Sequence, residues 1–400
     1  MENEIVEELY QALLEIKPVC GFPVYTSMDI RDDGQRAASV DVNLFPAGFN
    51  NIGETGKKLA GKKMRDFFSA KLLKSSPWKI TVVPEAHTNN FGYLENLADI
   101  LEILELAGAE TKILWPGPEI PRPWIISTKS GKPLTYLPAS EALENPDALL
   151  LNHDLSGGLP KAIHNYQGPI FPHPKLGWYK RKKSSHFEIA EALLKKIAEQ
   201  ISDFDPWFYS IKSRSLGDLD MDRREDIQKV IHEGKDFFKE LRAQHKMRGI
   251  SKDPYIFMKN DAGTYGMGVM SFLNEADLDQ AESKIRKKMR IGKESVKISR
   301  VIFQEGLASN YNCPKQKAVA EPVVYSVHGS PVGGFYRVQR SEGTDLDRIS
   351  LNQPGSTLEP LDSPMVTARN IPPLELLERG KIYHFLATVH SIAAALEECP

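Results

Sequence analysis

The chain contains 400 residues, of which 41% are hydrophobic and 26% are charged. This composition is typical of a globular protein and excludes a fibrous or wholly disordered one. Lys and Arg number 51 and Asp and Glu number 53, for a formal net charge of −2. Because sequence-independent nucleic-acid binding depends on excess positive charge, we expect no nucleic-acid partner.

The sequence shows no sign of a membrane or disulfide-rich protein. The first residues, MENEIVEELYQALLEI, are acidic, whereas a signal peptide opens on a basic segment, and no apolar run approaches the ~18 residues of a membrane span. We therefore expect a cytoplasmic protein without a membrane partner. Cys20, Cys313 and Cys399 lie far apart, which indicates neither a disulfide framework nor a CxxC metal site.

The N-terminal half has the pattern of an α/β fold. A strand at Lys79–Pro84, a helix around Tyr93–Ala107 and a strand at Thr111–Trp115 form a βαβ unit, which implies a parallel pair. Further strands of the same sheet are expected at Ala148–Leu151 and Pro169–Phe171.

Two polar loops follow strands of this predicted sheet. They are EAHTNN, residues 85–90, and NHDLSGG, residues 152–158. Open parallel sheets bind ligands beyond the carboxyl ends of their strands, so we expect these two loops to meet at a ligand-binding edge.

Outside this sheet, apolar spacing predicts helices over 1–17, 186–202 and 222–247, and short strands and loops within 22–56. A boundary near residue 200 would divide the chain into an N-terminal α/β domain, 1–200, and a second domain, 201–400. The second domain is predicted to contain strands at Tyr255–Lys259, Gly268–Phe272, Arg300–Gln304, Ala320–His328 and Pro331–Gln339, and helices around Glu275–Met289 and Leu374–Glu397.

A glycine-rich segment, YIFMKNDAGTYGMGVMSF, places Lys259 at the end of one strand and Gly263, Gly266 and Gly268 in the loop before the next. Glycines allow close backbone approach, their N–H groups can surround an anion, and a lysine adds a point charge to the same phosphates. A plain β-hairpin with a glycine-rich turn explains the same spacing. The segment has neither the Rossmann fingerprint nor a Walker A loop.

Later segments carry groups that suit an adenine edge and a metal ion. The strand VIFQEGL ends in Gln304 and Glu305, which can hydrogen-bond a base. Glu321 and Asn352 lie on or just after predicted strands, and their oxygens suit Mg²⁺, a hard cation that takes few protein ligands. The alternative explanation for Gln304 and Glu305 is a strand end that simply carries polar residues.

In this order, the lysine-tipped strand, GTYGMG loop, QEG hinge, arginine hairpin and asparagine resemble an ATP-grasp domain. The fuller set of motifs resembles the proteobacterial ATP-grasp type of glutamate–cysteine ligase. The matching stretches cover most of the chain and are VDVNLFPAGFNNI (40–52), VVPEAHTNNFGYLENLADI (82–100), LLNHDLSGGLP (150–160), GWYKRKKSSHF (177–187), DPWF (205–208), KNDAGTYGMGVM (259–270) and EPVVYSV…GGFYRV…SLNQPG (321–355).

The resemblance implies an ATP-grasp fold preceded by a Rossmann-like (pre-ATP-grasp) parallel-sheet domain. It also implies an ATP-dependent ligase that forms γ-glutamylcysteine from L-glutamate and L-cysteine through γ-glutamyl phosphate, the first step of glutathione biosynthesis, with ATP and Mg²⁺ as cofactors. The GTYGMG loop would act as a closing lid.

Carried over position by position, the resemblance assigns four roles. The ATP phosphates would be bound by Lys259, Gly263, Thr264, Tyr265, Gly266, Met267 and Gly268, and adenine by Gln304 and Glu305. Arg337 would face the transferring phosphate or the acyl phosphate, and Glu321 and Asn352 would bind Mg²⁺. Many ATP-grasp enzymes have a Glu two residues before the metal-binding Asn, where this chain has Ser350. Asp345 and Asp347 are therefore also candidate carboxylate ligands, although a solvated acidic loop explains them as well.

Joining two amino acids requires cations for carboxylates and acidic or carbonyl groups for an ammonium group. The candidate substrate-binding residues are Arg31, Asn43, Asn50, Glu85, His87, Thr88, Asn90, Arg181, Lys182 and Lys183. Structural explanations compete with this role: a solvated charged turn for the basic run 181–183, a cap or salt bridge for Glu85, and a structural hydrogen bond for His87.

Two other functions fit the same residues. One is another ATP-grasp carboxylate–amine ligase, and the other is a nucleotide-binding protein without catalytic activity. Small-molecule substrates are the expected partners, and the sequence is compatible with a homo-oligomer.

Overall fold

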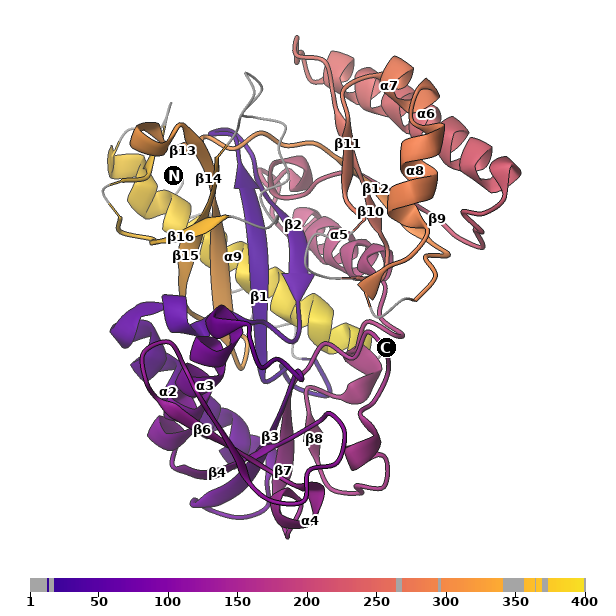
Figure 1. Cartoon of the computed structure of the whole chain (residues 1–400). Coiled ribbons are helices and arrows are strands. Elements are labelled where there is room, and N and C mark those ends of the chain that lie inside the picture. The colour runs from indigo at the N-terminus through magenta and orange to yellow at the C-terminus, as the bar shows by residue number, and fades with distance from the viewer. Residues whose placement is uncertain are drawn as a thin grey trace.

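The computed structural model describes Leu13 and residues 18–263, 268–293, 296–340, 356–363, 365–368 and 373–398, without the side chains of 340 and 373–378. Within these residues the strands form three β-sheets (Figure 1). In this view a mainly parallel sheet lies at the bottom, a seven-stranded antiparallel sheet in the middle and a four-stranded antiparallel sheet at the upper right.

The mainly parallel sheet confirms the predicted βαβ unit. Its strands, in spatial order, are β5 (Trp124–Ser127), β6 (Pro133–Leu137), β4 (Ala109–Leu114), β3 (Trp78–Pro84), β7 (Ala148–Asn152) and β8 (Ile170–Phe171). Strand β3 pairs in parallel with β4 and β7, whereas β5 pairs antiparallel with β6. The short helix α4 (Ala139–Ala142) precedes β7.

Helix α3 (Phe91–Ala107) joins β3 to β4 and begins and ends as the sequence predicts. The Asn90 side chain accepts a hydrogen bond from the Tyr93 N–H, and Gly108 ends the helix with φ at 90°, a conformation that favours glycine. Helix α2 (Gly53–Lys71) packs beside α3. Its first turn replaces the loop expected up to residue 56.

The seven-stranded sheet combines strands from both halves of the chain. They are β16 (Thr357–Pro360), β15 (Ser330–Arg340), β14 (Ala318–Val327), β1 (Tyr25–Asp32) and β2 (Ala37–Asn43), with β13 (Tyr311–Cys313) and β17 (Thr367–Ala368) beside them. The strands predicted within 22–56 are confirmed, but β1 pairs with β14, Tyr25 opposite Val327. The domain division at residue 200 stays a prediction.

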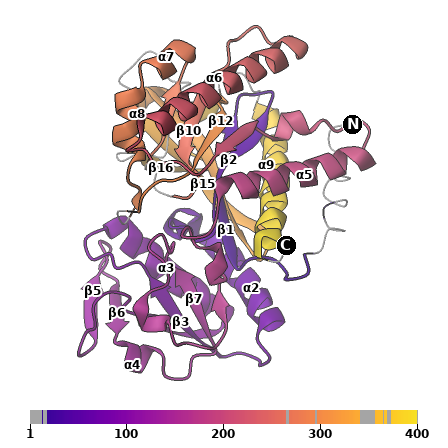
Figure 2. The same cartoon turned by 90° about the vertical axis from the view of Figure 1, so that its right-hand side faces the viewer.

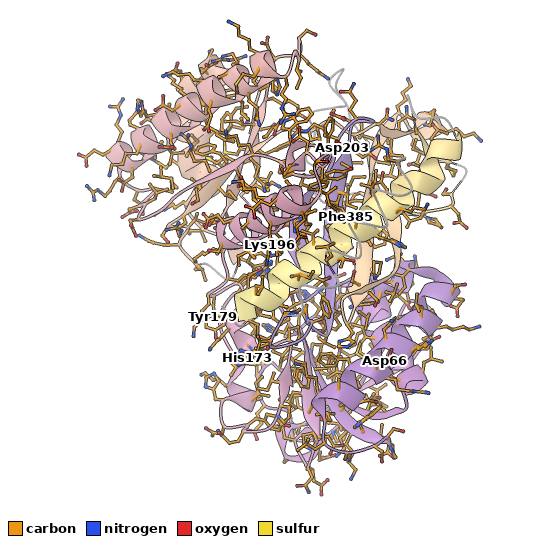
Figure 3. All side chains as sticks on the ribbon, turned by 180° about the vertical axis from the view of Figure 1, so that it is seen from behind. Asp66, His173, Tyr179, Lys196, Asp203 and Phe385 are labelled. Atoms are coloured by element: carbon orange, nitrogen blue, oxygen red, sulfur yellow. The ribbon has the colours of Figure 1, made fainter. Side chains whose placement is uncertain are left out.

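Helix α9 (Pro373–Glu398) packs on the apolar face of this sheet. Figure 3 shows the helix crossing the back of the molecule, with Phe385 labelled on it. Helix α5 (Lys183–Gln200) lies beside α9 (Figure 2). The opposite face of the sheet is therefore left for the polar side chains of β1, β14 and β15.

The four-stranded sheet has the order β11 (Met270–Phe272), β10 (Ile256–Asn260), β12 (Val301–Glu305) and β9 (Ser213–Leu216), all antiparallel. One face packs on α6 (Arg224–Met247), α7 (Glu275–Asp279) and α8 (Glu282–Met289). The helix predicted over 275–289 is interrupted at residues 280–281, yet Leu278 and Ile285 still enter the same core.

Three further expectations concern the cysteines, the N-terminal helix and membrane spans. Cys20 is disulfide-bonded, which the separation of the cysteines did not indicate, because the fold can bring distant residues together; Cys313 is buried and free. The helix expected over 1–17 lies outside the described residues except for Leu13. None of the described helices combines the length and the apolar content of a membrane span.

Candidate active site

A buried network of charges lies on the polar face of the seven-stranded sheet. Arg337 on β15 donates to Asp29 on β1, with Nη1–Oδ2 at 2.6 Å and Nη2–Oδ1 at 3.2 Å. Arg337 Nη1 also lies 2.8 Å from Glu321 Oε1, and Arg31 Nε lies 2.8 Å from Glu321 Oε2. Asp29 and Arg31 share a face because successive side chains of a strand alternate. Burial raises the pKa of Glu321, and the two guanidinium charges offset only part of this rise.

Two lysines extend this network from neighbouring elements. Lys259, near the end of β10, donates from Nζ to the carbonyl of Val40 at 2.9 Å. Lys183 at the start of α5 pairs with Asp41 on β2. Burial lowers the pKa of Lys259 to about 8, against the opposing charge of Asp41, and the charge of Glu321 also acts on it. These groups therefore form one electrostatically coupled site.

We call this site the central charge cluster. Its members are Asp29, Arg31, Asp41, Lys183, Lys259, Glu321 and Arg337. Such a set of fixed and largely buried charges can stabilise charge that develops during a reaction.

Gln304 lies on the same face of the four-stranded sheet as Lys259, since Gln304 is opposite Phe257 and Lys259 is opposite Ile302. The Gln304 side chain is only 1% exposed. Among the described residues, neither its Oε1 nor its Nε2 has a hydrogen-bond partner. A buried polar group without a partner is costly and is usually satisfied by water or a ligand, so Gln304 marks a position for a polar ligand edge.

Glu305, the next residue, points away from Gln304 and is held by Arg36. Two hydrogen bonds of 2.6 and 2.9 Å join their side chains, and Arg36 lies 4.1 Å above the Trp207 ring. Burial raises the pKa of Glu305, but the hydrogen bonds from Arg36 and His245 and the charge of Arg36 together lower it to about 2. A cavity of about 260 Å³ lies beside this pair, lined in part by residues 305–310.

A second charged cluster lies where β3 and β7 end, as the two polar loops predict. Lys293, after α8, lies 2.9 and 3.0 Å from the two carboxylate oxygens of Glu85 and 2.7 Å from Asp154 Oδ2. His87 Nε2 lies 2.9 Å from Glu85 Oε2. Burial raises the pKa of Glu85, but the hydrogen bond from His87 and the charge of Lys293 lower it overall to about 2.

The other candidates of the N-terminal half are spread over several elements. Thr88 is half-buried on the same loop as Glu85, whereas Asn90 caps α3. Asn43 ends β2 and is half-buried. Asn50 has a buried Oδ1 that finds no partner within the described part of the chain.

The basic run 181–183 is divided between two environments. Arg181 donates from Nη1 to the Val42 carbonyl at 2.6 Å and pairs with Glu397 on α9, Nε–Oε2 2.8 Å. His186 also hydrogen-bonds Glu397. Arg181 therefore ties β2 to α9, Lys182 is half-buried, and the third residue of the run belongs to the central charge cluster.

Two predicted loops fall largely outside the described residues. Gly263 and Gly268 border the glycine loop. The residues that lie outside the described ranges are Thr264, Tyr265, Gly266, Met267, Asp345, Asp347 and Asn352.

Sequence reasoning missed Asp29, Asp41 and Lys293 as members of charged clusters. The alternation of Asp29 with Arg31 was a usable signal, because it places both on one face of a predicted strand. Asp41 lies within the VDVN motif. Lys293 follows a lysine-rich helix and carries no local signal.

The described residues do not fit a magnesium ion at Glu321. Both of its oxygens accept from guanidinium groups, and within these ranges no three His, Cys, Asp or Glu side chains gather as a metal site. The fit for ATP is better, because one sheet face carries a half-buried lysine, Lys259, and the buried amide of Gln304, which has no partner among the described residues.

Comparison with known proteins identifies relatives of this chain. The family model described as "GshA: Glutamate-cysteine ligase" matches residues 10–398. A crystal structure described as a proposed gamma-glutamylcysteine synthetase from Methylobacillus flagellatus KT is 29% identical, with 99% of this chain and 93% of that chain covered and a TM-score of 0.82. No curated protein matches the sequence.

Two further solved structures are much less similar. D-alanyl-alanine synthetase A from Vibrio cholerae O1 biovar eltor str. N16961 is 10% identical, covers 78% of this chain and 81% of its own, and has a TM-score of 0.37. D-cycloserine synthetase DcsG is 12% identical, covers 80% and 81%, and has a TM-score of 0.35. Scores this low carry no argument about the site.

Proposed function

This chain belongs to the glutamate–cysteine ligase family, and we propose that its central charge cluster is where ATP activates glutamate. The reaction joins L-glutamate and L-cysteine at the expense of ATP and yields γ-glutamylcysteine, so the chain is a carbon–nitrogen ligase. The finer assignment, an ATP-grasp fold with a Rossmann-like N-terminal domain, is part of the proposal and is supported by the parallel sheet β3–β4–β7.

The observation that carries the site assignment is the convergence of four cations and three carboxylates from two sheets and α5. Phosphoryl transfer requires little covalent work from the protein, and positioning and electrostatic stabilisation supply most of the rate enhancement. Lys259 and Arg337 are the cations that we assign to the phosphate groups.

The face of the four-stranded sheet that carries Lys259 and Gln304 indicates how ATP would be oriented. Asn260, the residue after Lys259, adjoins Gly263 and Gly268, the ends of the glycine loop, and Gly268 has φ at 68°. Gln304 lies on the adjacent strand, toward the hinge. We assign the triphosphate to the Lys259 end and the adenine to the Gln304 end, where the unpartnered amide can accept from and donate to a base edge.

The reaction then follows from these positions. The γ-carboxylate of glutamate attacks the γ-phosphorus of ATP, giving γ-glutamyl phosphate and ADP, while Lys259 and Arg337 balance the negative charge. The amine of cysteine next attacks the acyl carbon, the C–N bond forms and phosphate leaves. Glu85 and His87, with Thr88, are assigned to the amino-acid substrates.

Several expectations stay predictions. Mg²⁺ binding rests on Asn352, Asp345 and Asp347, which lie outside the described ranges. The substrate roles of Asn90 and Arg181 compete with the helix cap and the α9 ion pair described above. A homo-oligomer, a cytoplasmic location and the lack of nucleic-acid partners likewise remain predictions.

An amino-acid panel with phosphate release as the readout tests the substrates. We expect ATP-dependent release, with one γ-glutamylcysteine per phosphate, when glutamate and cysteine are supplied together. Equal release with another amino-acid pair would assign the chain to a different carboxylate–amine ligase. ATP binding without release under any pair would favour the non-catalytic alternative.

The lowered pKa of Lys259 predicts how ATP affinity depends on pH. With a pKa of about 8, the ammonium is charged below that pH and neutral above it. Binding of a non-hydrolysable ATP analogue should therefore weaken as pH rises through 8, with the Kd approaching a ~10-fold increase per pH unit. Calorimetry on wild type and Lys259→Arg checks this, because an arginine stays charged and should flatten the profile; identical profiles for both proteins would contradict the assignment.

A further inference from the structure

Lys293 connects two parts of the molecule that are far apart in the sequence. It follows α8 on the four-stranded-sheet side and reaches Glu85 and Asp154, at the ends of β3 and β7. Its side chain is 17% exposed, and those of Glu85 and Asp154 are 8% and 5% exposed. Removing the lysine would leave two buried carboxylates without its charge, which is costly.

On its own side, Lys293 adjoins the base of the glycine loop. A Cβ atom at the preceding residue, Gly292, would lie 3.2 Å from Asn260 Nδ2. Asn260 in turn donates its backbone N–H to the Gly268 carbonyl at 3.2 Å, and its Oδ1 accepts from the Ala262 N–H at 3.1 Å. Gly292, the residue before Lys293, therefore adjoins Asn260 at the end of β10, next to Lys259.

On the other side, Glu85 and Asp154 lie at an edge of the parallel sheet that is held together by further hydrogen bonds. The Glu85 N–H donates to the Tyr93 hydroxyl at 2.8 Å, and that hydroxyl donates to the Asn152 carbonyl at 2.6 Å. Tyr93 thus fixes the ends of β3 and β7 relative to each other. Lys293 binds a rigid part of the parallel sheet rather than a free loop.

We infer that Lys293 is a positioning residue that holds the end of β10, which carries Lys259, against the substrate-binding edge, so that the acyl phosphate meets cysteine rather than water. This inference rests on the proposed function. Closed sites protect reactive intermediates from hydrolysis. Lys293 acts through the placement of the β10 end relative to the ends of β3 and β7, and no contact with the reacting atoms is assigned to it.

Loss of the bridge should uncouple ATP consumption from ligation. In the coupled reaction, the cysteine nitrogen attacks the acyl carbon of γ-glutamyl phosphate and phosphate leaves. In the uncoupled reaction, water attacks instead, the bond from the acyl carbon to the phosphate oxygen breaks, and glutamate and phosphate are released. The net result is hydrolysis of ATP to ADP and phosphate.

The test compares phosphate released with γ-glutamylcysteine formed in Lys293→Met. We expect a ratio near one in wild type, a several-fold excess of phosphate in the variant, and a loss of kcat/KM for ligation of roughly 10- to 100-fold, the size expected when reacting groups are misplaced by about 1 Å. Lys293→Arg keeps the charge and should restore most of the coupling.

Two variants serve as controls. Lys297→Met removes a nearby exposed lysine whose Nζ lies 3.4 Å from Asp222, and it should retain a ratio near one. Asp154→Asn weakens the bridge from the other side and should also uncouple the reaction; it carries the test if Lys293→Met does not fold.

The outcomes are distinguishable from failure of the proposed function. A fall in thermal stability or kcat with a ratio that stays near one in both bridge variants would overturn the inference and leave a structural salt bridge. A wild-type protein that releases no phosphate with glutamate and cysteine would instead overturn the proposed function.

Discussion

Replacing Lys259 with alanine is expected to lower the rate of γ-glutamylcysteine formation by roughly 10²- to 10³-fold, the usual cost of removing one preorganised charge-stabilising group. Lys259 is the half-buried cation near the end of β10, and its Nζ donates a hydrogen bond to the Val40 carbonyl. Its removal therefore takes positive charge from the central charge cluster while the β10–β12 pairing remains. Steady-state kinetics and ATP-analogue binding measure the loss.

A matched control is Lys79→Ala, which removes an exposed lysine from β3. Both variants should retain the circular dichroism spectrum of wild type. If Lys259→Ala ligates at the wild-type rate, Lys259 has no role with phosphate and the site must lie elsewhere.

Replacing Arg337 with methionine is expected to lower the free energy of unfolding by about 3–5 kcal/mol, the cost of leaving buried charges without their partner. Arg337 is 13% exposed and donates to both Asp29 and Glu321, which are each 3% exposed. The variant leaves Asp29 without its guanidinium and leaves Glu321 with Arg31 alone. Urea denaturation at pH 7 measures the change.

A double variant separates the effect of the lost charge on stability from the effect of lost packing. Adding Asp29→Asn to Arg337→Met should regain part of the lost stability, because the uncompensated carboxylate disappears. Ligation should stay at least ~10²-fold below wild type in both variants, since the cation assigned to the transferring phosphate is missing. Stability that is unchanged in Arg337→Met, or activity restored by Asp29→Asn, would contradict the assignment.

Local patterns were enough for the parallel sheet. Strands β3, β4 and β7 are short apolar runs, and α3 carries its own stop in Gly108, so each element could be predicted from its own residues. The partner of β1 could not be predicted in this way. Its register against β14 depends on which strands meet after the chain has folded, and no property of residues 25–32 specifies that.

The same distinction applies to the site. Lys259, Glu321 and Arg337 were predicted because each stands in a motif, and the structure places them in one cluster. Asp29 belongs to the cluster only through the pairing of β1 with β14. Lys293 contacts Glu85 at the end of a strand of another sheet. No periodic pattern in the sequence predicts this contact.

In the basic run, a structural role competes with the predicted one. A cluster of charges beside aromatic residues suggested substrate binding for Arg181, yet its guanidinium is satisfied by Glu397 and the Val42 carbonyl. The sequence could not reveal this, because Glu397 lies at the far end of the chain. Asn90 likewise follows the ordinary rule that asparagine before an apolar helix is a cap.

The pairing of Tyr25 with Val327 also bears on how the protein is made. During synthesis β1 and β2 leave the ribosome long before β14 exists, so the edge of β1 that will bind β14 stays open for most of translation. An open strand edge is a template for association with other chains, and such non-local pairing is slow to form. Newly made chains should therefore need shielding at this hairpin until their last third has emerged.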